Sequence, residues 1–270
     1  MIETGLYAIT NCGVPRHYAV DVKPDYVSIA VFEFANPGTA TGMGGVLLWA
    51  DLLAHLGRMD GVQALILTGA TFGDSLERVH KAKAAGVLAM EAMWSRYLPQ
   101  ASIIRQMLAA GTLGEITLLQ ADFGQDNREI ARLWLKDSSI VMDMGIYPIS
   151  FAQMVLGSPS RIIASGKMHN ENVEGMAAVI LEYESGARAV LTISGHSHVP
   201  TTASISGDEG VLVLDGPFFI PTSIELRPAL FNSHGPRWSD ETGVIGHEGL
   251  SYQATYMAKC IQEGLLESPL

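Results

Sequence analysis

Six short segments rich in β-branched and apolar residues limit this chain to a fold with a large sheet. They are EITLLQADFG (115–124), RIIASGKMH (161–169), GMAAVILEYE (175–184), ARAVLTISGHS (187–197), TTASISG (201–207) and GVLVLDG (210–216). Turn residues such as Glu-Ser-Gly (184–186) and Asp-Glu-Gly (208–210) separate several of them. Because consecutive strands joined by tight turns pair antiparallel, the sequence predicts an open, mostly antiparallel β-sheet.

Three helical patterns accompany these strands in the second part of the chain. A first helix is predicted between residues 95 and 114 and ends near Gly111, a second follows Asp143, and a third covers residues 252–266. Strands mixed with such helices are typical of the α+β class. We therefore expect residues 87–270 to form an α+β domain, with the helices on one face of the sheet.

Residues 1–86 carry a different pattern, in which strands and helices alternate. Two strands and two helices are expected, over residues 25–35, 46–57, 62–70 and 74–86. The order strand–helix–strand–helix is typical of a parallel βαβ layer. Residues 1–24 show no clear pattern. The first part is therefore interpreted as a short, incomplete, Rossmann-like α/β segment of the nucleotide-binding type.

Net charge and cysteine content exclude several classes of partner. The formal net charge is −11, whereas nucleic acids and anionic membranes are bound by basic surfaces. No apolar run reaches the roughly 18 residues of a membrane-spanning helix, and residues 1–20 do not resemble a signal peptide. Cys12 and Cys260 lie far apart, without metal-binding spacing. We expect a reduced, cytoplasmic chain that binds neither nucleic acid nor membrane.

A glycine-rich turn, GTATGMGGV, lies between the first predicted strand and helix. A dinucleotide fingerprint needs G-x-G-x-x-G at this place, and Gly42 and Gly44 supply its first two glycines. Leu47 occupies the third position, and Thr68-Gly69 stands where a ribose-binding carboxylate is expected. The non-functional interpretation of this segment is a flexible turn. If it binds a cofactor, Gly42 and Gly44 are the candidate contacts.

The stretch VMDMGIYP, residues 141–148, places a carboxylate and a phenol in an apolar setting. Asp143 and Tyr147 are four residues apart, so they share one face of a helix, and Pro148 favours a helix start here. A phenol can pass a proton to a carbonyl oxygen, and a nearby carboxylate can orient it or bind a hydroxyl. The alternative is structural: Asp143 caps the helix, and Tyr147 packs at its edge.

Other chemically capable residues give no pattern that specifies a site. His196-Ser197-His198 would place two imidazoles on one face of a strand, but no third ligand is evident, so a solvent-facing strand end is expected. No metal site is predicted. Trp94, Arg96 and Phe123 lie in apolar surroundings, where such side chains belong to a core more often than to a pocket.

Four stretches, taken together, resemble one family of enzymes. They are EAMWSRYLP (91–99), IIRQMLAAGTLGEITLLQADFG (103–124), VMDMGIYPISFAQMVLGSPS (141–160) and GLSYQATYMAKCIQEGLLESP (249–269). In this order they resemble the second domain of the glucose–fructose oxidoreductase and inositol dehydrogenase family, Gfo/Idh/MocA, in its dimeric dihydrodiol dehydrogenase branch. The resemblance covers roughly residues 74–270.

This resemblance implies an oxidoreductase that uses NAD or NADP and acts on a sugar, polyol or dihydrodiol. Asp143 and Tyr147 fall on the family's acid and on its catalytic position. Trp94, Arg96 and Phe123 fall on positions that line the substrate pocket. The resemblance also implies a homodimer formed through the β-sheet, with a small-molecule substrate as the other partner.

Two features depart from the family pattern. The Glu-Lys-Pro motif, which supplies the family's catalytic lysine, would fall near residues 65–67, where this chain has Leu65-Ile66-Leu67. The first domain is also short, and residues 1–73 partly resemble the opening of the enoyl-CoA hydratase family. The main hypothesis is therefore a dehydrogenase of weak or no activity. The alternatives are a non-catalytic substrate-domain protein that dimerises and an acyl-CoA-binding, crotonase-like fusion.

Overall fold

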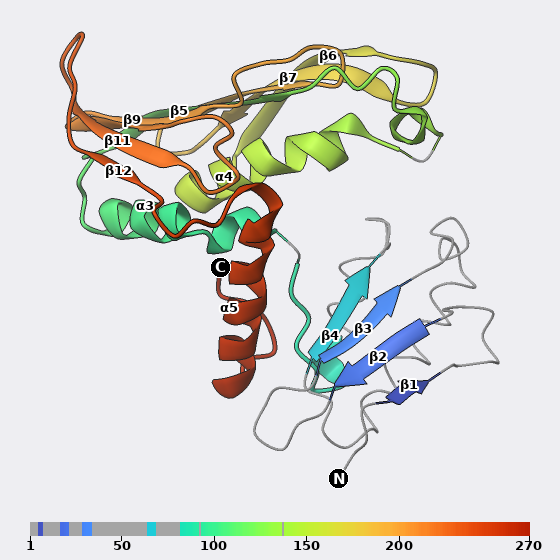
Figure 1. Cartoon of the computed structure of the whole chain (residues 1–270). Helices are drawn as coiled ribbons and strands as arrows, with labels where there is room; N and C mark the ends of the chain where they lie inside the picture. The colour runs from blue at the N-terminus through green and yellow to red at the C-terminus, as the bar shows by residue number, and fades with distance from the viewer. Residues whose placement is uncertain are drawn as a thin grey trace. The chain divides into compact units, whose positions relative to one another are not determined.

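The computed structural model describes four short strands in the first part of the chain and nearly all of the second part (Figure 1). The described residues are 5–7, 17–21, 29–33, 64–68, 82–91, 93–136 and 138–270. The chain divides into two compact units. One unit contains Met1–Ala92 with Ala254–Pro269, and the other contains Met93–Gln253 with Leu270.

The first unit contains a four-stranded sheet. Its strands are β1 (Gly5–Tyr7), β2 (His17–Asp21), β3 (Ile29–Glu33) and β4 (Ala64–Thr68), in that order across the sheet. β1, β2 and β3 pair antiparallel, whereas β3 and β4 pair in parallel, with Val31 opposite Ile66. The two strands expected in this region are confirmed, and their parallel pairing agrees with a βαβ layer.

The first unit also differs from the sequence-based expectation. Residues 1–24, which showed no clear pattern, contribute β1 and β2, so the sheet is mixed rather than parallel. Leu65-Ile66-Leu67, where the family lysine would fall, lie inside β4. Several expected features lie outside the described residues: the helix over 46–57, most of the helix over 74–86, and the glycine-rich turn with Gly42 and Gly44.

The C-terminal helix α5 (Leu250–Gln262) confirms the helix expected over residues 252–266. It ends shortly before Gly264, whose φ of 70° suits a residue without a side chain. Within the first unit, the buried Met257 and Cys260 of this helix pack with Leu88 in a small apolar core. Because the two residues are three positions apart, they lie on one helix face.

The second unit is built on an eight-stranded sheet. Its strands are β5 (Ile116–Gly124), β6 (Arg161–Met168), β7 (Glu174–Glu182), β8 (Arg188–Ser194), β9 (Ala203–Gly207), β10 (Gly210–Leu214), β11 (Ser223–Pro228) and β12 (Arg237–Ser239). Their order across the sheet is β12-β11-β10-β9-β5-β8-β7-β6. Neighbouring strands pair antiparallel, except β5 and β8, which run in parallel.

All six strands expected in this part of the chain are present, as β5 to β10, and the mostly antiparallel sheet is confirmed. β11 and β12 had not been expected. β11 carries Glu225 and Arg227 among its apolar residues, and β12 has only 3 residues. Neither therefore shows the continuous β-branched signal that marks a strand in the sequence.

Two helices cover one face of this sheet (Figure 1). α3 (Pro99–Ala109) and α4 (Ile146–Leu156) lie on the same side, as expected. α3 begins with proline at its first position and ends before Gly111, whose φ is 69°. Strand residues that point toward the helices form the core, among them Leu119, Leu191 and Ile205. Among the described residues, no helix is long and apolar enough to cross a membrane.

The opposite face of the sheet is open to solvent at its β6–β8 end. Strand register places Ile163, Ile180 and Val190 side by side there, and each is between 36% and 40% exposed. Next to them, Glu182 forms ion pairs with Arg161 and Arg188. We call Ile163, Ile180 and Val190 the apolar stripe.

Replacement of Leu119 tests this account of the core. Leu119 is fully buried in β5, so Leu119→Ala should leave a cavity and lower the free energy of unfolding by about 2–5 kcal/mol. Thr117→Ala, in the same strand but exposed at the register shift between Ile116 and Leu118, should change it by less than about 1 kcal/mol. Urea denaturation followed by circular dichroism measures both variants. Equal losses in the two would contradict the assignment.

Candidate active site

The turn that carries Asp143 is fixed to the sheet. Val141–Gly145 form a single π-helical turn, η5, which runs directly into α4. Glu174, at the start of β7, accepts hydrogen bonds from the Val141 N–H, at 2.8 Å, and from the Ser139 hydroxyl. The Ser139 hydroxyl oxygen accepts the Met142 N–H at 3.1 Å. Ser139 and Glu174 therefore satisfy N–H groups that a helix start leaves open.

Asp143 does not cap this helix. The N-cap positions of η5 and α4 are Ile140 and Gly145, and neither turn has a side-chain cap of its own. The Asp143 side chain is exposed, and no other residue in the described part of the chain hydrogen-bonds its carboxylate. The capping alternative is wrong, and the carboxylate is available to an external hydroxyl. A π turn at this place is also a frequent feature of functional sites.

Tyr147 lies in the first turn of α4 and is partly buried. The Trp94 indole N–H donates a hydrogen bond to the Tyr147 hydroxyl oxygen at 3.1 Å. Burial raises the pKa of the Tyr147 phenol, the Trp94 hydrogen bond acts in the opposite direction, and the Asp143 carboxylate raises the pKa further. The phenol is therefore neutral at pH 7. One lone pair of its oxygen is occupied, and its proton is available to an acceptor.

Aromatic rings surround the Tyr147 side chain. Its ring centroid lies 4.3 Å from that of Phe219, 5.7 Å from Phe123 and 6.4 Å from Trp94. Phe123 comes from the end of β5, Trp94 from the short 3₁₀ helix η3 (Trp94–Tyr97), and Phe219 from the segment between β10 and β11. The fold thus brings three of the sequence candidates, Tyr147, Trp94 and Phe123, into one cluster.

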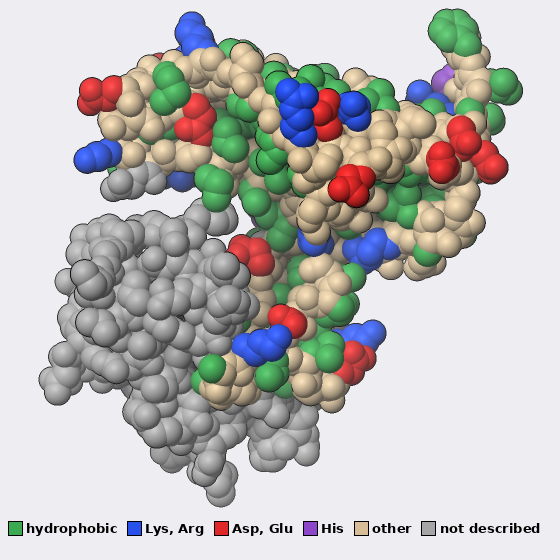
Figure 2. Space-filling view, turned by 180° about the vertical axis from the view of Figure 1, so that it is seen from behind, with side chains coloured by type: hydrophobic (Ala, Val, Ile, Leu, Met, Phe, Trp, Pro, Cys, Tyr) green, Lys and Arg blue, Asp and Glu red, His purple; other side chains and the backbone are tan. Residues whose placement is uncertain are grey.

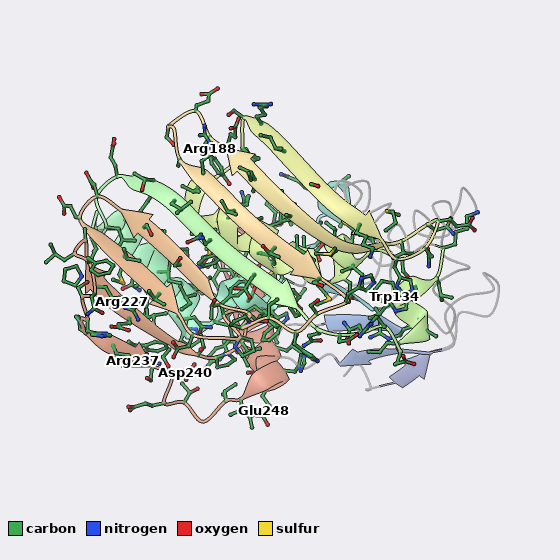
Figure 3. The ribbon with its side chains drawn as sticks, turned by 90° about the horizontal axis from the view of Figure 1, so that it is seen from above. Trp134, Arg188, Arg227, Arg237, Asp240 and Glu248 are labelled. Carbon is green, nitrogen blue, oxygen red and sulfur yellow. The ribbon has the colours of Figure 1, made fainter. Side chains whose placement is uncertain are left out.

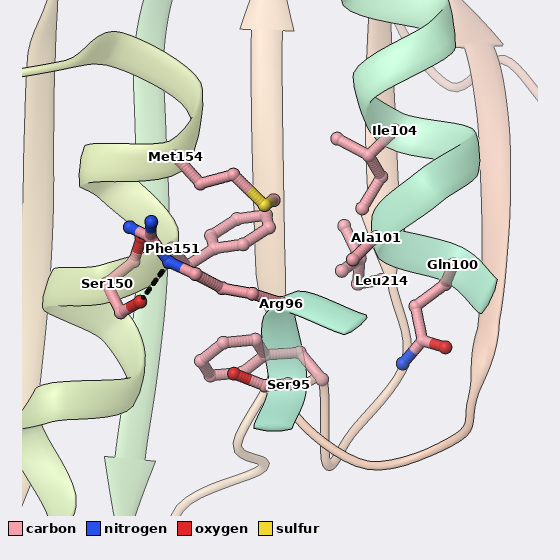
Figure 4. A pocket seen from close by; sticks show the side chains of 10 residues that line it. Ser95, Arg96, Gln100, Ala101, Ile104, Ser150, Phe151, Met154 and Leu214 are labelled. Atoms are coloured by element: carbon pink, nitrogen blue, oxygen red, sulfur yellow. Dashed lines mark hydrogen bonds between the residues drawn. The ribbon is translucent and has the colours of Figure 1, made fainter. Parts of the chain in front are cut away.

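Arg96 lies on the same short helix as Trp94 and reaches toward α4 (Figure 4). Its guanidinium donates hydrogen bonds to the Ser150 hydroxyl at 2.8 Å, to the Ser150 carbonyl at 3.0 Å and to the Gln153 side-chain oxygen. Burial lowers the pKa of Arg96. The residue also lines a cavity of about 20 Å³, which has room for one water molecule. Arg96 thus joins η3 to α4, and its contact with substrate stays a prediction.

Two residues of this cluster had no sequence signal. Phe219 lies beside Tyr147, and the ring centroid of His247 is 5.8 Å from that of Trp94. His247 comes from the 3₁₀ turn η6 (Gly246–Gly249), which is far from Trp94 and from Tyr147 along the chain. Since no spacing rule relates residues so distant in sequence, only the fold brings them to the phenol.

A second cluster lies near the ends of β6 and β8, around Trp134 (Figure 3). His169 and His196 face each other with 2.9 Å between Nδ1 and Nε2, and Trp134 stacks on His169 at a centroid distance of 3.8 Å. Burial, followed by the nearness of His169, lowers the pKa of His196. His198 is exposed. Among residues that the structure describes, no group of three or more metal-ligating side chains occurs.

Tyr147 and Asp143 together can carry out proton transfer. The neutral Tyr147 phenol can donate its proton to a carbonyl oxygen, and the exposed Asp143 carboxylate can accept a hydrogen bond from a neighbouring hydroxyl. Burial, the indole and the Asp143 carboxylate are the influences on the phenol's pKa within the described part of the chain, and no cation is among them. The protonated phenol, which can donate a proton, is therefore the form of Tyr147 present at neutral pH. Gly42 and Gly44, the candidates for a cofactor contact, lie outside the described residues.

Comparison with known sequences concerns mainly the second unit. Residues 102–213 match the model of the GFO/IDH/MocA C-terminal domain family. A trans-1,2-dihydrobenzene-1,2-diol dehydrogenase from Bos taurus is 32% identical over 211 residues, which cover 75% of this chain and 62% of the bovine protein. The chain thus spans less than two thirds of the length of this relative.

Solved structures show the same fold. An NAD-binding oxidoreductase from Klebsiella pneumoniae has a TM-score of 0.63 at 17% identity, over 79% of this chain and 73% of that chain. A 3-ketoreductase from Actinomadura kijaniata, in complex with NADP and TDP-benzene, has a TM-score of 0.63 at 19% identity, over 81% and 68%. At these identities the likeness concerns the fold alone.

Trp94→Phe and Asp143→Asn should move the pKa of Tyr147 in opposite directions. Loss of the indole N–H removes an influence that lowers the pKa, so the pKa rises, whereas loss of the Asp143 charge lowers it. NMR titration of tyrosine labelled with ¹³C at Cζ measures both shifts, and Tyr147→Phe assigns the signal. Tyr183, whose pKa is raised by burial alone, is the internal control. Shifts of the same sign would contradict the geometry.

Proposed function

Residues 102–213 match the model of the GFO/IDH/MocA C-terminal domain family, and from this match we propose that the chain is an NAD(P)-dependent oxidoreductase. Its substrate is a small molecule with a CH–OH group: a sugar, a polyol or a dihydrodiol. The dihydrodiol class suits the apolar surroundings of Tyr147, and the bovine relative is named for such a substrate. The observation that carries the proposal is the hydrogen bond from Trp94 to Tyr147.

Each side chain of the cluster has a role in the proposed reaction. When bound, NAD or NADP supplies or accepts the hydride. In the direction of reduction, Tyr147 donates its proton to the carbonyl oxygen, because its raised pKa keeps the phenol protonated. The Trp94 N–H orients the phenol and directs its proton away from the indole. Asp143 accepts a hydrogen bond from a second hydroxyl of the substrate.

The residues beside Tyr147 fit one part of a nicotinamide cofactor. The Tyr147 ring is partly exposed and is backed by the buried rings of Phe123 and Phe219, so a flat ring that packs on Tyr147 meets an apolar support. Asp143 and part of Tyr147 remain accessible beside these rings. Gly42 and Gly44 are the residues proposed to approach the phosphates of the cofactor.

We propose that turnover is weak. The family's catalytic lysine has no counterpart at Leu65-Ile66-Leu67, which lie in β4. Among the described residues no cation influences the pKa of Tyr147, so the proton transfer at the phenol, which carbonyl reduction and alcohol oxidation share, lacks the assistance that a lysine would give. Loss of one positioned acid–base partner typically costs about 10²–10⁴-fold in rate.

Cofactor titration and one substitution test this function. NADH or NADPH should bind saturably, measured by nicotinamide fluorescence, and a cyclic hydroxyketone should be reduced. Tyr147→Phe should lower kcat by about 10²–10⁴-fold and leave the cofactor Kd unchanged, because it removes only the transferable proton. Tyr183→Phe, a change at another buried tyrosine, is the matched control and should retain turnover.

The two alternatives predict other outcomes of the same titration. Absence of NADH and NADPH binding up to millimolar cofactor would overturn the oxidoreductase and favour a non-catalytic substrate-domain protein. A thermal shift with acetyl-CoA, without one for NADH, would favour the acyl-CoA-binding fusion. Neither alternative explains why the Trp94 indole should hold the Tyr147 phenol close to the exposed Asp143 carboxylate.

The proposed location is the cytoplasm. Cys260 is a buried free thiol, which suits a reducing compartment. The net charge of −11 argues against nucleic acid and anionic membrane as partners, so the small-molecule substrate and a second copy of the chain are the partners proposed.

The second copy is proposed to bind through the open face of the eight-stranded sheet. The apolar stripe of Ile163, Ile180 and Val190 supports this, because neighbouring exposed apolar side chains on one surface mark interaction sites. The adjoining Arg161 and Arg188 already pair with Glu182. Each guanidinium of that rim therefore already has a carboxylate contact, although one carboxylate serves both.

Two neighbouring isoleucines of β6 provide a matched test of the homodimer. Ile163 pairs with Ile180 on the open face, whereas Ile162 pairs with Leu181 and points to the helix side. Ile163→Asp should raise the dimer Kd by about 100-fold or more, since it buries a charge twice in a symmetric interface. Ile162→Asp should leave it within about threefold. Sedimentation equilibrium measures both; a monomeric wild-type chain would overturn the homodimer.

A further inference from the structure

The segment that joins β11 to β12, residues 229–236, projects from the second unit. We call it the arm. Leu230 is 73% exposed and Phe231 is 103% exposed. In Figure 1 the arm rises beyond the sheet on the side away from α3 and α4, and Figure 2 shows hydrophobic side chains at the end of this projection. The arm therefore extends on the same side as the open face.

The base of the arm is held by specific hydrogen bonds. Glu225 of β11 accepts the Gly235 N–H at 3.4 Å and faces the His234 ring at 3.2 Å. The hydrogen bond from Arg227 is the largest of the influences that hold the pKa of Glu225 at about 2, so this carboxylate is charged at neutral pH. The Pro228 carbonyl accepts the Leu230 N–H at 2.7 Å and the Ser233 hydroxyl at 2.9 Å.

An ordered loop that presents two large apolar side chains is suited to be an anchor. Because the base is already held, little further ordering is needed when Leu230 and Phe231 become buried. The sequence of the arm, ALFNSHGP, contains no Asp, Glu, Lys or Arg. Burial of its tip would therefore desolvate no carboxylate, ammonium or guanidinium group.

The apolar stripe on the same molecule is out of reach. Four strand spacings separate β11 from β8, the nearest strand of the stripe, or roughly 19 Å at about 4.8 Å each. The arm folds back on itself as a hairpin, so four residues in each direction reach about 14 Å at most. A stripe that receives this arm must therefore belong to a second molecule.

We propose that the arm of each copy packs on the apolar stripe of a second copy. This inference rests on the proposed homodimer and assigns its anchors. With two sheets face to face, a two-fold axis along the strands reverses the strand order, so β11–β12 of one copy lies over β6–β8 of the other. Both arms are then buried at once, and Leu230 and Phe231 contact Ile163, Ile180 and Val190.

A double substitution tests the anchors. Leu230→Ser with Phe231→Ser should raise the dimer Kd by about 100-fold or more, because central aromatic anchors dominate an interface and each change occurs twice. Leu135→Ser with Ile245→Ser is the matched control, since these side chains are 61% and 71% exposed and lie outside the arm. The control should shift Kd by less than about threefold. Sedimentation equilibrium measures both proteins.

Gly235→Ala tests the arm while Leu230 and Phe231 are kept. A β-carbon at Gly235 would lie 1.7 Å from the Leu226 carbonyl oxygen, so the base of the arm must shift. Dimerisation should weaken in this variant as well. Circular dichroism checks that the sheet remains folded, and a folded variant with unchanged Kd would contradict the proposal.

Cross-linking tests the partner surface directly. Two differently tagged copies, one with Phe231→Cys and the other with Ile180→Cys, should form a disulfide that joins the two tags. The unsubstituted chain gives the background from Cys12 and Cys260. A dimer that tolerates Leu230→Ser with Phe231→Ser but dissociates with Ile163→Asp would overturn the proposed role of the arm. The proposal of a dimer through the sheet face would then stand. A monomeric wild-type chain would overturn both, whereas NADH binding tests the oxidoreductase independently.

Discussion

β5 unites the second unit, because it joins two runs of antiparallel strands that have no other pairing between them. β6, β7 and β8 form one run, β9 to β12 form the other, and β5 pairs with β8 on one side and β9 on the other. The Asp122 carboxylate of this strand accepts the Thr201 N–H at 2.7 Å and so fixes the approach to β9. Phe123, the next residue, enters the aromatic cluster of Tyr147. One central strand thus positions both the sheet and the candidate site.

Local pattern was sufficient for some of these features and not for others. Strands β5 to β10 and the helices could be predicted, because apolar alternation and glycine stops depend on neighbouring residues. The place of β5 between β8 and β9 could not, since pairing between distant strands leaves no local trace. Spacing marked Asp143 and Tyr147. The π turn, the N–H groups of that turn that donate to Ser139 and Glu174, and the approach of Phe219 and His247 depend on tertiary contacts.

Each polar group of the candidate site makes a different contact. Ser139 and Glu174 accept the N–H groups at the start of the helix, so Asp143 is not needed as a cap and its carboxylate remains exposed. Trp94 occupies the Tyr147 oxygen, so the phenol keeps one proton to give. Arg96, expected in the pocket from resemblance, holds α4 through Ser150. The sequence resemblance makes Asp143 and Tyr147 the centre of the proposed enzyme, and Leu65-Ile66-Leu67 in β4 stand where the family's lysine motif would fall.

The central position of β5 has a consequence for synthesis of the chain. Leu118 pairs with Arg188, and Gln120 pairs with Ser204, so both partners of β5 leave the ribosome long after β5 itself. Long-range pairing of this kind slows folding, because a long loop must close before any contact stabilises it. Until then both edges of β5 expose unpaired N–H and carbonyl groups, which invite pairing with other chains. The central strand of the sheet is thus made first and stays unpaired until β8 and β9 have followed it.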